Sequence, residues 1–156
     1  MKLIETGKTR SDVKRIGFVM VDDSDFELLS QQNWQLGADG YPRSHGEVKL
    51  MSRFIMNAPR HLEVDHIDGN PLNNQRANLR LATSSQNKCN RGARKDCKSG
   101  YKGVSWHSQR NKWTARIKAG TKYLHLGLFE DIKDAVSAYN NAAQKYHGEF
   151  AFINKL

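Results

Sequence analysis

The spacing of apolar side chains changes along the chain, and each spacing indicates a different kind of element. Apolar and polar residues alternate over residues 102–106, 112–118 and 122–126, as in half-buried strands separated by turns. From Ile132 to Tyr146 the apolar residues recur three and four positions apart, as on one face of a helix. Asp131 can cap the start of this helix, and Gly148 fits its end. The pattern predicts a three-stranded antiparallel sheet packed on one helix.

The first sixty residues predict short strands and turns. Ile16–Val21 is strand-like, and Asp22, Asp23, Ser24 and Asp25 offer caps for a following helix. Residues 34–41 favour a hairpin, and a short helix or strand follows over residues 50–56. We find no group of catalytic side chains in this region and expect it to support the rest of the fold.

Residues 61–92 carry the pattern of two strands and a short helix. One strand ends near residue 67, a loop follows, and a returning strand covers residues 79–81. Ser84 or Ser85 would cap the helix that comes next. Such a ββα unit would bring together three polar side chains: Asp65, His66 and Asn87.

The length of 156 residues leaves room for two small domains. We expect an α+β protein with a β-rich N-terminal support region (1–60), a ββα core (61–92), a basic linker (93–98) and the sheet-and-helix domain (99–156). The sequence has no run of 18 apolar residues and no signal-like start, so we expect a cytoplasmic protein that does not enter a membrane. In that compartment, Cys89 and Cys97 favour two free thiols over a disulfide.

The net charge of +9 is concentrated in one segment. Residues 91–118 hold nine Lys and Arg against the single acid Asp96, a balance of +8. Solvated surfaces usually mix both signs, so this block indicates a polyanionic partner. A basic disordered linker would have the same charge, but Trp106 and Trp113 lie inside the block and favour folded structure.

Three motifs follow one another in the central unit: V-D-H-I-D-G-N from Val64, N-x-x-x-N-L-R-L-A-T from Asn74, and S-Q-N-x-x-N from Ser85. Together they resemble the HNH endonuclease family, in the His-Asn-Asn form common among phage and intron-borne enzymes. The resemblance covers residues 50–92, and the first fifty residues look similar to the lead-in of such enzymes. Many relatives carry His where this chain has Ser52, which lies outside the core motif. The resemblance implies hydrolysis of DNA phosphodiester bonds that leaves 5′-phosphate and 3′-hydroxyl ends.

The resemblance also implies a role for each motif residue. Asp65 and Asn87 would bind one divalent metal ion, and His66 would act as the general base, since an imidazole titrates near neutral pH. Asn78 would fix the loop and the orientation of the imidazole. We expect Mg²⁺, with Mn²⁺ as the alternative, because hard cations prefer oxygen ligands and stabilise the charge of the transition state. An isolated Asp-His pair is more often structural, but this pair stands in a complete motif.

Other polar residues near the motif have simpler explanations. The loop residues favour local backbone bonding in turns over metal binding: Asp68, Asn70, Asn73 and Asn74. Cys89 and Cys97 are not part of a C-x-x-C pair, so we expect no structural zinc.

Residues 99–156 carry S-G-Y-K-G-V-S-W, K-W-T-A-R-I, H-L-G-L-F, D-A-V-S-A-Y and H-G-E-F-A-F-I-N. They resemble the DNA-binding domain of plant ethylene-response factors, the APETALA-two fold, which also occurs fused to phage HNH nucleases. The resemblance implies that the outer face of the sheet reads double-stranded DNA. Strand alternation turns Trp113, Ala115 and Ile117 inward.

By position, the resemblance assigns DNA binding to seven residues of this half: Lys102, Ser105, His107, Arg116, Lys118, Tyr123 and His125. The basic segment before it can contact phosphates, and there we expect DNA contacts from Arg91, Arg94 and Lys95. Several arginines and a tryptophan of the family are replaced, at residues 105, 107, 123 and 125. The base preference of the plant domain is therefore not expected here. For Trp106, a packing role in the core or a loop is about as well supported as a contact with a DNA base or sugar. In the N-terminal region we expect further DNA contacts from Arg43, Lys49 and Arg53.

These features together predict a site-specific, metal-dependent DNA endonuclease of phage or homing type. We expect a monomer that acts in the cytoplasm of a bacterial host. One alternative is a non-catalytic, sequence-specific DNA-binding regulator with a relic nuclease motif, which the intact motif residues disfavour. The other is an RNA-directed or colicin-like nonspecific nuclease, which a dedicated reading domain disfavours.

Overall fold

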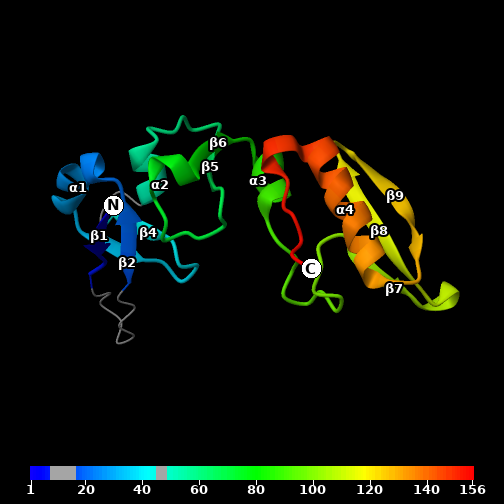
Figure 1. Ribbon diagram of the computed structural model, residues 1–156. Coiled ribbons are helices and arrows are strands. Elements are labelled where there is room, and N and C mark those ends of the chain that lie inside the picture. Colours follow the sequence, from blue (N-terminus) through cyan, green and yellow to red (C-terminus); the bar gives the residue numbers. More distant parts are fainter. Residues whose placement is uncertain (8–16, 45–48) are drawn as a thin grey trace. The chain divides into compact units, whose positions relative to one another are not determined.

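The computed structural model describes residues 1–7, 17–44 and 49–156. The chain divides into two compact units, Met1–Asn87 and Lys88–Leu156, and the boundary falls inside helix α3 (Ser84–Asn90) (Figure 1). This division differs from the four parts expected above. Residues 1–60 and the central motif share one unit, and the basic segment belongs to the second. The difference arises because burial joins segments that sequence patterning treats separately.

In its described residues, the first unit contains three small antiparallel strand pairs and short helices. Strands β1 (Lys2–Glu5) and β2 (Phe18–Val21) pair first, followed by α1 (Asp23–Ser30), the hairpin β3 (Trp34–Leu36) and β4 (Pro42–Ser44), and α2 (Met51–Ile55). The third pair is β5 (Glu63–His66) with β6 (Leu79–Ala82), which a short 3₁₀ turn (Arg76–Asn78) precedes. The expected strand, hairpin and helix are confirmed, although the expected strand start, Ile16, lies outside the described residues.

One hydrophobic core runs through this unit and joins its early and late segments. Trp34 is fully buried at its centre, and its indole nitrogen donates a hydrogen bond to the carbonyl oxygen of Leu29 at 2.8 Å. Leu79 of β6 lies in the same cluster, and Val64 of β5 packs against it. The first sixty residues therefore support the central motif through a shared core.

The acidic start of α1 does not cap that helix with a side chain. Asp22 is the cap residue, but its carboxylate instead accepts a hydrogen bond from the backbone nitrogen of Arg76 at 2.8 Å. Asp25 accepts two hydrogen bonds from the Arg76 guanidinium, at 2.7 and 2.8 Å. The acids that patterning assigned to helix capping thus hold the turn that leads into β6.

The second unit is a three-stranded antiparallel sheet with one helix packed on it. Strands β7 (Val104–His107), β8 (Lys112–Ala119) and β9 (Lys122–Phe129) follow in sequence order, with β8 in the centre, and α4 (Ile132–His147) covers one face. The buried residues between sheet and helix include Ala115, Ile117 and Val136. This arrangement is the one that the sequence predicts.

Both ends of α4 are also as predicted. The carboxylate of Asp131 accepts a hydrogen bond from the backbone nitrogen of Lys133 at 2.8 Å. Gly148, with φ of +54°, ends the helix through a hydrogen bond from its backbone nitrogen to the carbonyl oxygen of Gln144. Within the described part of the chain, none of the helices combines the length and hydrophobicity that spanning a bilayer requires.

Candidate active site

Strands β5 and β6 bring the Asp-His pair to the end of a hairpin. Their register places Asp65 opposite Arg80 and His66 opposite Leu79. Both motif side chains are buried, with 4% of Asp65 and 5% of His66 exposed. A buried carboxylate needs a partner. Arg80 supplies it through two hydrogen bonds to Asp65 Oδ2, from Nε at 2.8 Å and from Nη2 at 2.7 Å.

Helix α3 begins with a capping box. The hydroxyl of Thr83 accepts a hydrogen bond from the Gln86 backbone nitrogen at 3.3 Å, and Gln86 Oε1 accepts one from the Thr83 backbone nitrogen at 2.8 Å. The cap residue is therefore Thr83, and not Ser84 or Ser85 as the sequence suggested. The shift by one position arises because the side chain of Gln86 can reach back only to Thr83. This cap sets where α3 begins and hence where Asn87 lies.

Asn87 faces strand β5. Its amide nitrogen donates a hydrogen bond to Glu63 Oε2 at 2.6 Å. Side chains two apart on a strand share a face, so Glu63 and Asp65 lie on the same side of β5. The oxygen-bearing side chains of Asp65 and Asn87 therefore approach the same side of the hairpin, from β5 and α3.

Asn74 holds the imidazole of His66. Asn74 is fully buried, and its amide nitrogen donates to the carbonyl oxygen of Pro71 at 2.9 Å, which turns its oxygen toward His66 Nε2 at 3.3 Å. An amide oxygen only accepts, so Nε2 carries the proton and the lone pair of the neutral imidazole is on Nδ1. The ring of Tyr41 packs edge-on against the imidazole, with ring centroids 5.8 Å apart.

Burial lowers the pKa of His66 below its ordinary value of 6.5, and the Asn74 hydrogen bond and the charges of Asp68 and Asp65 only partly offset this effect. The imidazole is consequently neutral at physiological pH, which is the form that a general base requires.

Asn78 organises the loop between the two strands. Its amide oxygen accepts a hydrogen bond from the Asp68 backbone nitrogen at 3.0 Å, and its amide nitrogen donates to Asp68 Oδ1 and to the Asn73 carbonyl oxygen, each at 2.9 Å. The sequence assigned both the loop and the imidazole to Asn78. The structure divides these tasks, because Asn78 bonds to the loop and Asn74 bonds to the imidazole.

The loop aspartate has turn contacts of the kind expected for it. Burial alone would raise the pKa of Asp68, but hydrogen bonds from Asn70, Asn73 and Asn78 lower it on balance, together with the nearby His66. The side chain of Asp68 is thus engaged in local bonding.

The donor set suits a hard divalent cation. Asp65 offers a carboxylate, and Asn87 offers an amide oxygen because its nitrogen is held by Glu63. Oxygen donors of these two kinds, supplemented by phosphate and water, are the ligands that Mg²⁺ prefers. Among the described residues, no three His, Cys, Asp or Glu side chains gather as a metal-binding group. The proposed ligands Asp65 and Asn87 are one carboxylate and one amide, so they do not form such a group of three.

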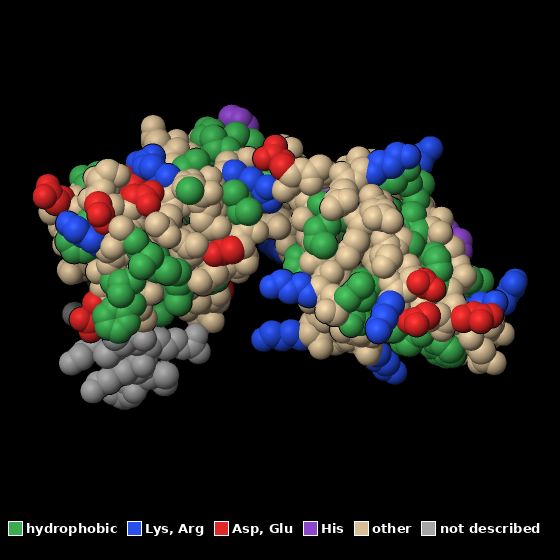
Figure 2. All heavy atoms as spheres, in the orientation of Figure 1, with side chains coloured by type: hydrophobic (Ala, Val, Ile, Leu, Met, Phe, Trp, Pro, Cys, Tyr) green, Lys and Arg blue, Asp and Glu red, His purple; other side chains and the backbone are tan. Residues whose placement is uncertain are grey.

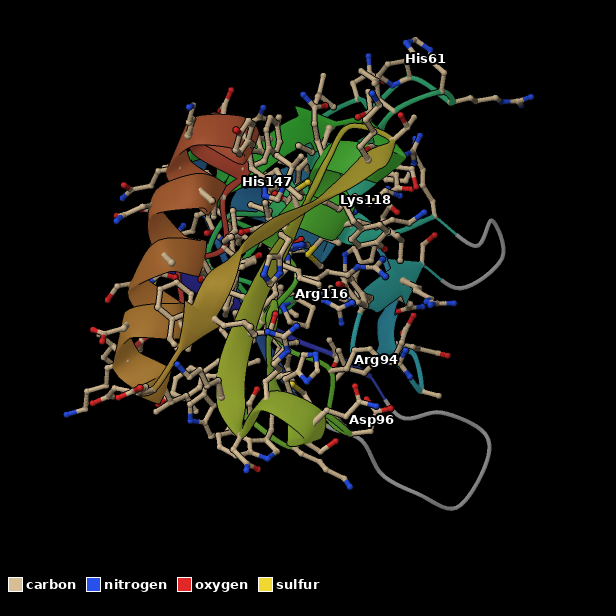
Figure 3. All side chains as sticks on the ribbon, turned by 90° about the vertical axis from the view of Figure 1, so that its right-hand side faces the viewer. His61, Arg94, Asp96, Arg116, Lys118 and His147 are labelled. Carbon is tan, nitrogen blue, oxygen red and sulfur yellow. The ribbon has the colours of Figure 1, made fainter. Side chains whose placement is uncertain are left out.

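The outer face of the second sheet is basic and partly aromatic. The labelled side chains of Arg116 and Lys118 lie on β8, on the side of the strands away from α4 in Figure 3. Arg116 pairs with His125 of β9, and Lys118 pairs with Tyr123, whose side chain is 74% exposed. Ser105 and His107 of β7 lie on the same face by alternation.

This face is free of acidic residues, since none of the three strands contains Asp or Glu. Of the five acids of the second unit, Glu130, Asp131 and Asp134 lie around the start of α4, in the region where Figure 2 shows a group of acidic side chains. The charge of the unit is therefore separated, and the sheet face is the one suited to a polyanion.

Lys102 does not lie on this face. Its ammonium donates to the carbonyl oxygens at the end of α3: those of Lys88 at 3.2 Å, Cys89 at 2.6 Å and Arg91 at 2.5 Å. Burial lowers the pKa of Lys102, although the nearby Cys89 acts in the opposite direction. The ammonium lies at a helix end because strand β7 begins at Val104 and leaves Lys102 in the preceding turn, and its DNA contact stays a prediction.

The remaining predicted contacts differ in their surroundings. Arg91 and Lys95 are exposed, and Arg94 forms an exposed ion pair with Asp96, with both bonds at 3.0 Å. In the first unit, the guanidinium of Arg53 donates to three backbone carbonyl oxygens, of Leu62, Ala58 and Pro59, so it is committed to the fold. Arg43 pairs with Asp39, and the Lys49 ammonium lies 5.1 Å from the ring centroid of Phe54.

Similarity to known proteins decides the family. Residues 57–89 match the HNH endonuclease family. The chain is 36% identical over 146 residues to an uncharacterised HNH endonuclease of Acanthamoeba polyphaga mimivirus, a stretch that covers 89% of this chain and 75% of the relative. The chain belongs to the HNH endonuclease family. This family member is also 38% identical over 93 residues to Protein 3.8 of Escherichia phage T7, which covers 60% of the chain and 76% of the phage protein.

A shorter part of this HNH endonuclease is similar to plant proteins. It is 41% identical over 58 residues to an ethylene-responsive transcription factor of Arabidopsis thaliana, which covers 36% of this chain and 14% of the plant protein. An AP2-like ethylene-responsive transcription factor of Arabidopsis thaliana is 45% identical over 56 residues, which covers 35% of this chain and 11% of that protein. No solved structure matches the chain.

Sequence patterning of this HNH endonuclease missed three residues that contact the motif. Arg80 pairs with Asp65, Asn74 bonds to His66, and Glu63 bonds to Asn87. Strand alternation could have found Glu63, because it lies two positions before Asp65. The second motif begins at Asn74, but its spacing does not indicate which side chain Asn74 contacts.

Proposed function

We propose that this chain is a divalent-metal-dependent endonuclease that hydrolyses double-stranded DNA at sites chosen by its second unit. One observation carries the proposal. The Asp-His pair stands at the end of the β5–β6 hairpin, and Asn87 of α3 bonds to the same strand through Glu63, in a chain of the HNH endonuclease family.

The side chains would divide the reaction as follows. Asp65 and Asn87 would hold the metal ion, whose chemistry is to neutralise charge on the phosphate and favour the leaving group. His66 Nδ1 would accept a proton from the attacking water, because Nε2 is engaged with Asn74. Attack at phosphorus and departure of the 3′-oxygen would leave 5′-phosphate and 3′-hydroxyl ends.

The second unit would supply selection of the site. We infer that it has the APETALA-two-like fold, because the motifs resembling that family all lie in residues 99–156 and the plant matches have a similar length. Base edges in the major groove are read by side chains on a protruding element. The candidates on the outer sheet face are Ser105, His107, Arg116, Lys118, Tyr123 and His125.

The direct test is a plasmid-cleavage assay. Wild-type protein should cleave the plasmid in the presence of Mg²⁺, and excess EDTA should stop the cleavage. Asp65→Ala and Asn87→Ala should each lower the cleavage rate. His66→Ala should lower the rate by about 10²–10⁴-fold and leave DNA binding intact. His61→Ala is the matched control, because His61 is an exposed histidine of the same unit (labelled in Figure 3) and should cut normally.

The assay also separates the alternatives. Full activity in EDTA would rule out the metal mechanism, and normal cleavage by His66→Ala would remove the proposed base. DNA binding without cleavage under any metal condition would favour a non-catalytic regulator.

A further inference from the structure

The contact between Glu63 and Asn87 suggests a role for a residue outside the family motifs. The two side chains come from different elements, β5 and α3, and the separation from Asn87 Nδ2 to Glu63 Oε2 is 2.6 Å. Hydrogen bonds that involve a charged acceptor are shorter and stronger than neutral ones. The contact therefore restrains the Asn87 side chain.

The chemistry of the partner determines which way the amide turns. An Asn amide has an oxygen that accepts and a nitrogen that donates, and the two ends have almost the same shape. A carboxylate only accepts, so Glu63 can bind the nitrogen end and rejects the oxygen end. A cation has the opposite requirement, since it binds only the oxygen.

We propose that Glu63 is a positioning residue that selects the Asn87 amide orientation whose oxygen is available to the metal ion. The inference rests on the proposed function, because Asn87 is a ligand only if that site binds metal. Glu63 acts through Asn87, in the way that residues behind metal ligands orient them in other metalloproteins. Its place two residues before Asp65 keeps it on the face that both ligands share.

Two substitutions separate positioning from direct ligation. Glu63→Ala removes the acceptor and should weaken Mn²⁺ binding to the full-length protein by about 10–100-fold. Gln can still accept from Asn87 through its own amide oxygen, so Glu63→Gln should bind Mn²⁺ on the order of tenfold more tightly than Glu63→Ala. Glu5→Gln, at an exposed position on β1, is the matched control and should bind as wild type does.

A second readout tests the contact without metal or DNA. In the NMR spectrum of the full-length metal-free protein, the Asn87 side-chain amide gives a pair of proton signals. These signals are assigned by their absence from the spectrum of Asn87→Ala. This pair should shift strongly in Glu63→Ala, less in Glu63→Gln, and not in Glu5→Gln. Mn²⁺ binding is measured by electron paramagnetic resonance on the same samples.

Each result supports or overturns the proposal. Glu63→Gln that binds Mn²⁺ as weakly as Glu63→Ala would show that the negative charge itself is needed at the metal, and would make Glu63 a ligand. Unchanged Mn²⁺ binding and an unchanged Asn87 pair in Glu63→Ala would overturn the role of Glu63 alone. Wild-type protein that binds no Mn²⁺ would overturn the proposed function, and this role with it.

Discussion

The imidazole of His66 is held by neighbours that lie close in space and not beside it in sequence. Asn74 accepts the hydrogen bond from Nε2, and Tyr41 packs on the ring from the β3–β4 hairpin. A base that is oriented before substrate arrives need not lose rotational freedom during the reaction. At this scale the chemistry of His66 depends on a fully buried amide that belongs to the loop.

The variant Asn74→Ala should therefore lower both stability and activity. It removes the hydrogen bonds to the Pro71 carbonyl oxygen and to His66 Nε2, and the loss of buried hydrogen bonds costs about 1–3 kcal/mol of unfolding free energy. Urea unfolding measures the loss, and cleavage assays under folding conditions measure the activity. Asn33→Ala, at an exposed position, is the control and should change neither. Wild-type stability in Asn74→Ala would contradict the assignment.

The titration of His66 gives a second prediction at the residue scale. Burial lowers the pKa of His66 in the folded state below the ordinary 6.5. At pH values between the folded-state pKa and 6.5, the unfolded state therefore binds more protons than the folded state. The contribution of His66 to stability should therefore be complete above pH 6.5 and decrease as pH falls through the folded pKa.

NMR titration of the metal-free protein measures this pKa directly. The imidazole signal that is absent in His66→Ala should titrate with a midpoint below 6.5. A midpoint at or above that value would show that the imidazole is not buried as described.

Helix α3 shows how one short element is held at both ends. The Thr83–Gln86 capping box sets its beginning, and the Lys102 ammonium binds the carbonyl oxygens at its end. A helix of seven residues is too short to be stable alone, so these contacts and its surroundings maintain it. Because Asn87 follows the Thr83–Gln86 cap on α3, its position depends on that cap.

The variant Lys102→Met tests the assignment of Lys102 to the helix end. It should lower the unfolding free energy by about 1–3 kcal/mol, because the carbonyl oxygens lose a charged donor. It should leave the salt dependence of DNA affinity unchanged, since the ammonium is not a phosphate contact. Lys98→Met, at an exposed position in the same segment, is the stability control. If Lys102→Met made DNA affinity less dependent on salt and left stability unchanged, Lys102 would be a phosphate contact and not a helix cap.

At the scale of the whole molecule, charge and chemistry are assigned to different parts of the chain. Residues 91–118 carry a balance of +8, and the proposed metal ligands and base lie in the other unit. Positive charge increases affinity for any DNA, whereas choice of sequence requires particular side chains at base edges. We therefore expect affinity and specificity to respond to different substitutions on the sheet.

Arg116→Ala and Lys118→Ala test this separation. If Arg116 reads a base, its loss should cost about 1–3 kcal/mol and relax the preference at one position of the target. If Lys118 contacts phosphate, its loss should weaken all sequences alike and reduce the log–log salt slope by about 0.9. Binding to target and random duplexes across a salt series distinguishes the two effects.

Lys133→Ala is the control for this series, because Lys133 is exposed in the first turn of α4, away from the strands. Equal effects of Arg116→Ala, Lys118→Ala and Lys133→Ala would mean that the sheet face is not the DNA surface.

The kinds of element and the residue types of the candidate site could be predicted from the amino-acid sequence. Period-two and helical spacing predicted β7, β8, β9 and α4, because alternation along a strand and the turn of a helix depend only on local geometry. The D-H motif and the later asparagines indicated the family, which similarity along the chain then showed.

The partner of each polar group depends on how the elements pack. Asn74 bonds to His66, Thr83 caps α3, and the Lys102 ammonium binds the carbonyl oxygens at a helix end. The division at Asn87 likewise came from the shared core, which joins β1 to β6. A hydrogen bond depends on distances between atoms that are remote in sequence. Spacing along one element predicts the face on which a side chain lies, and the packing of several elements determines its partner.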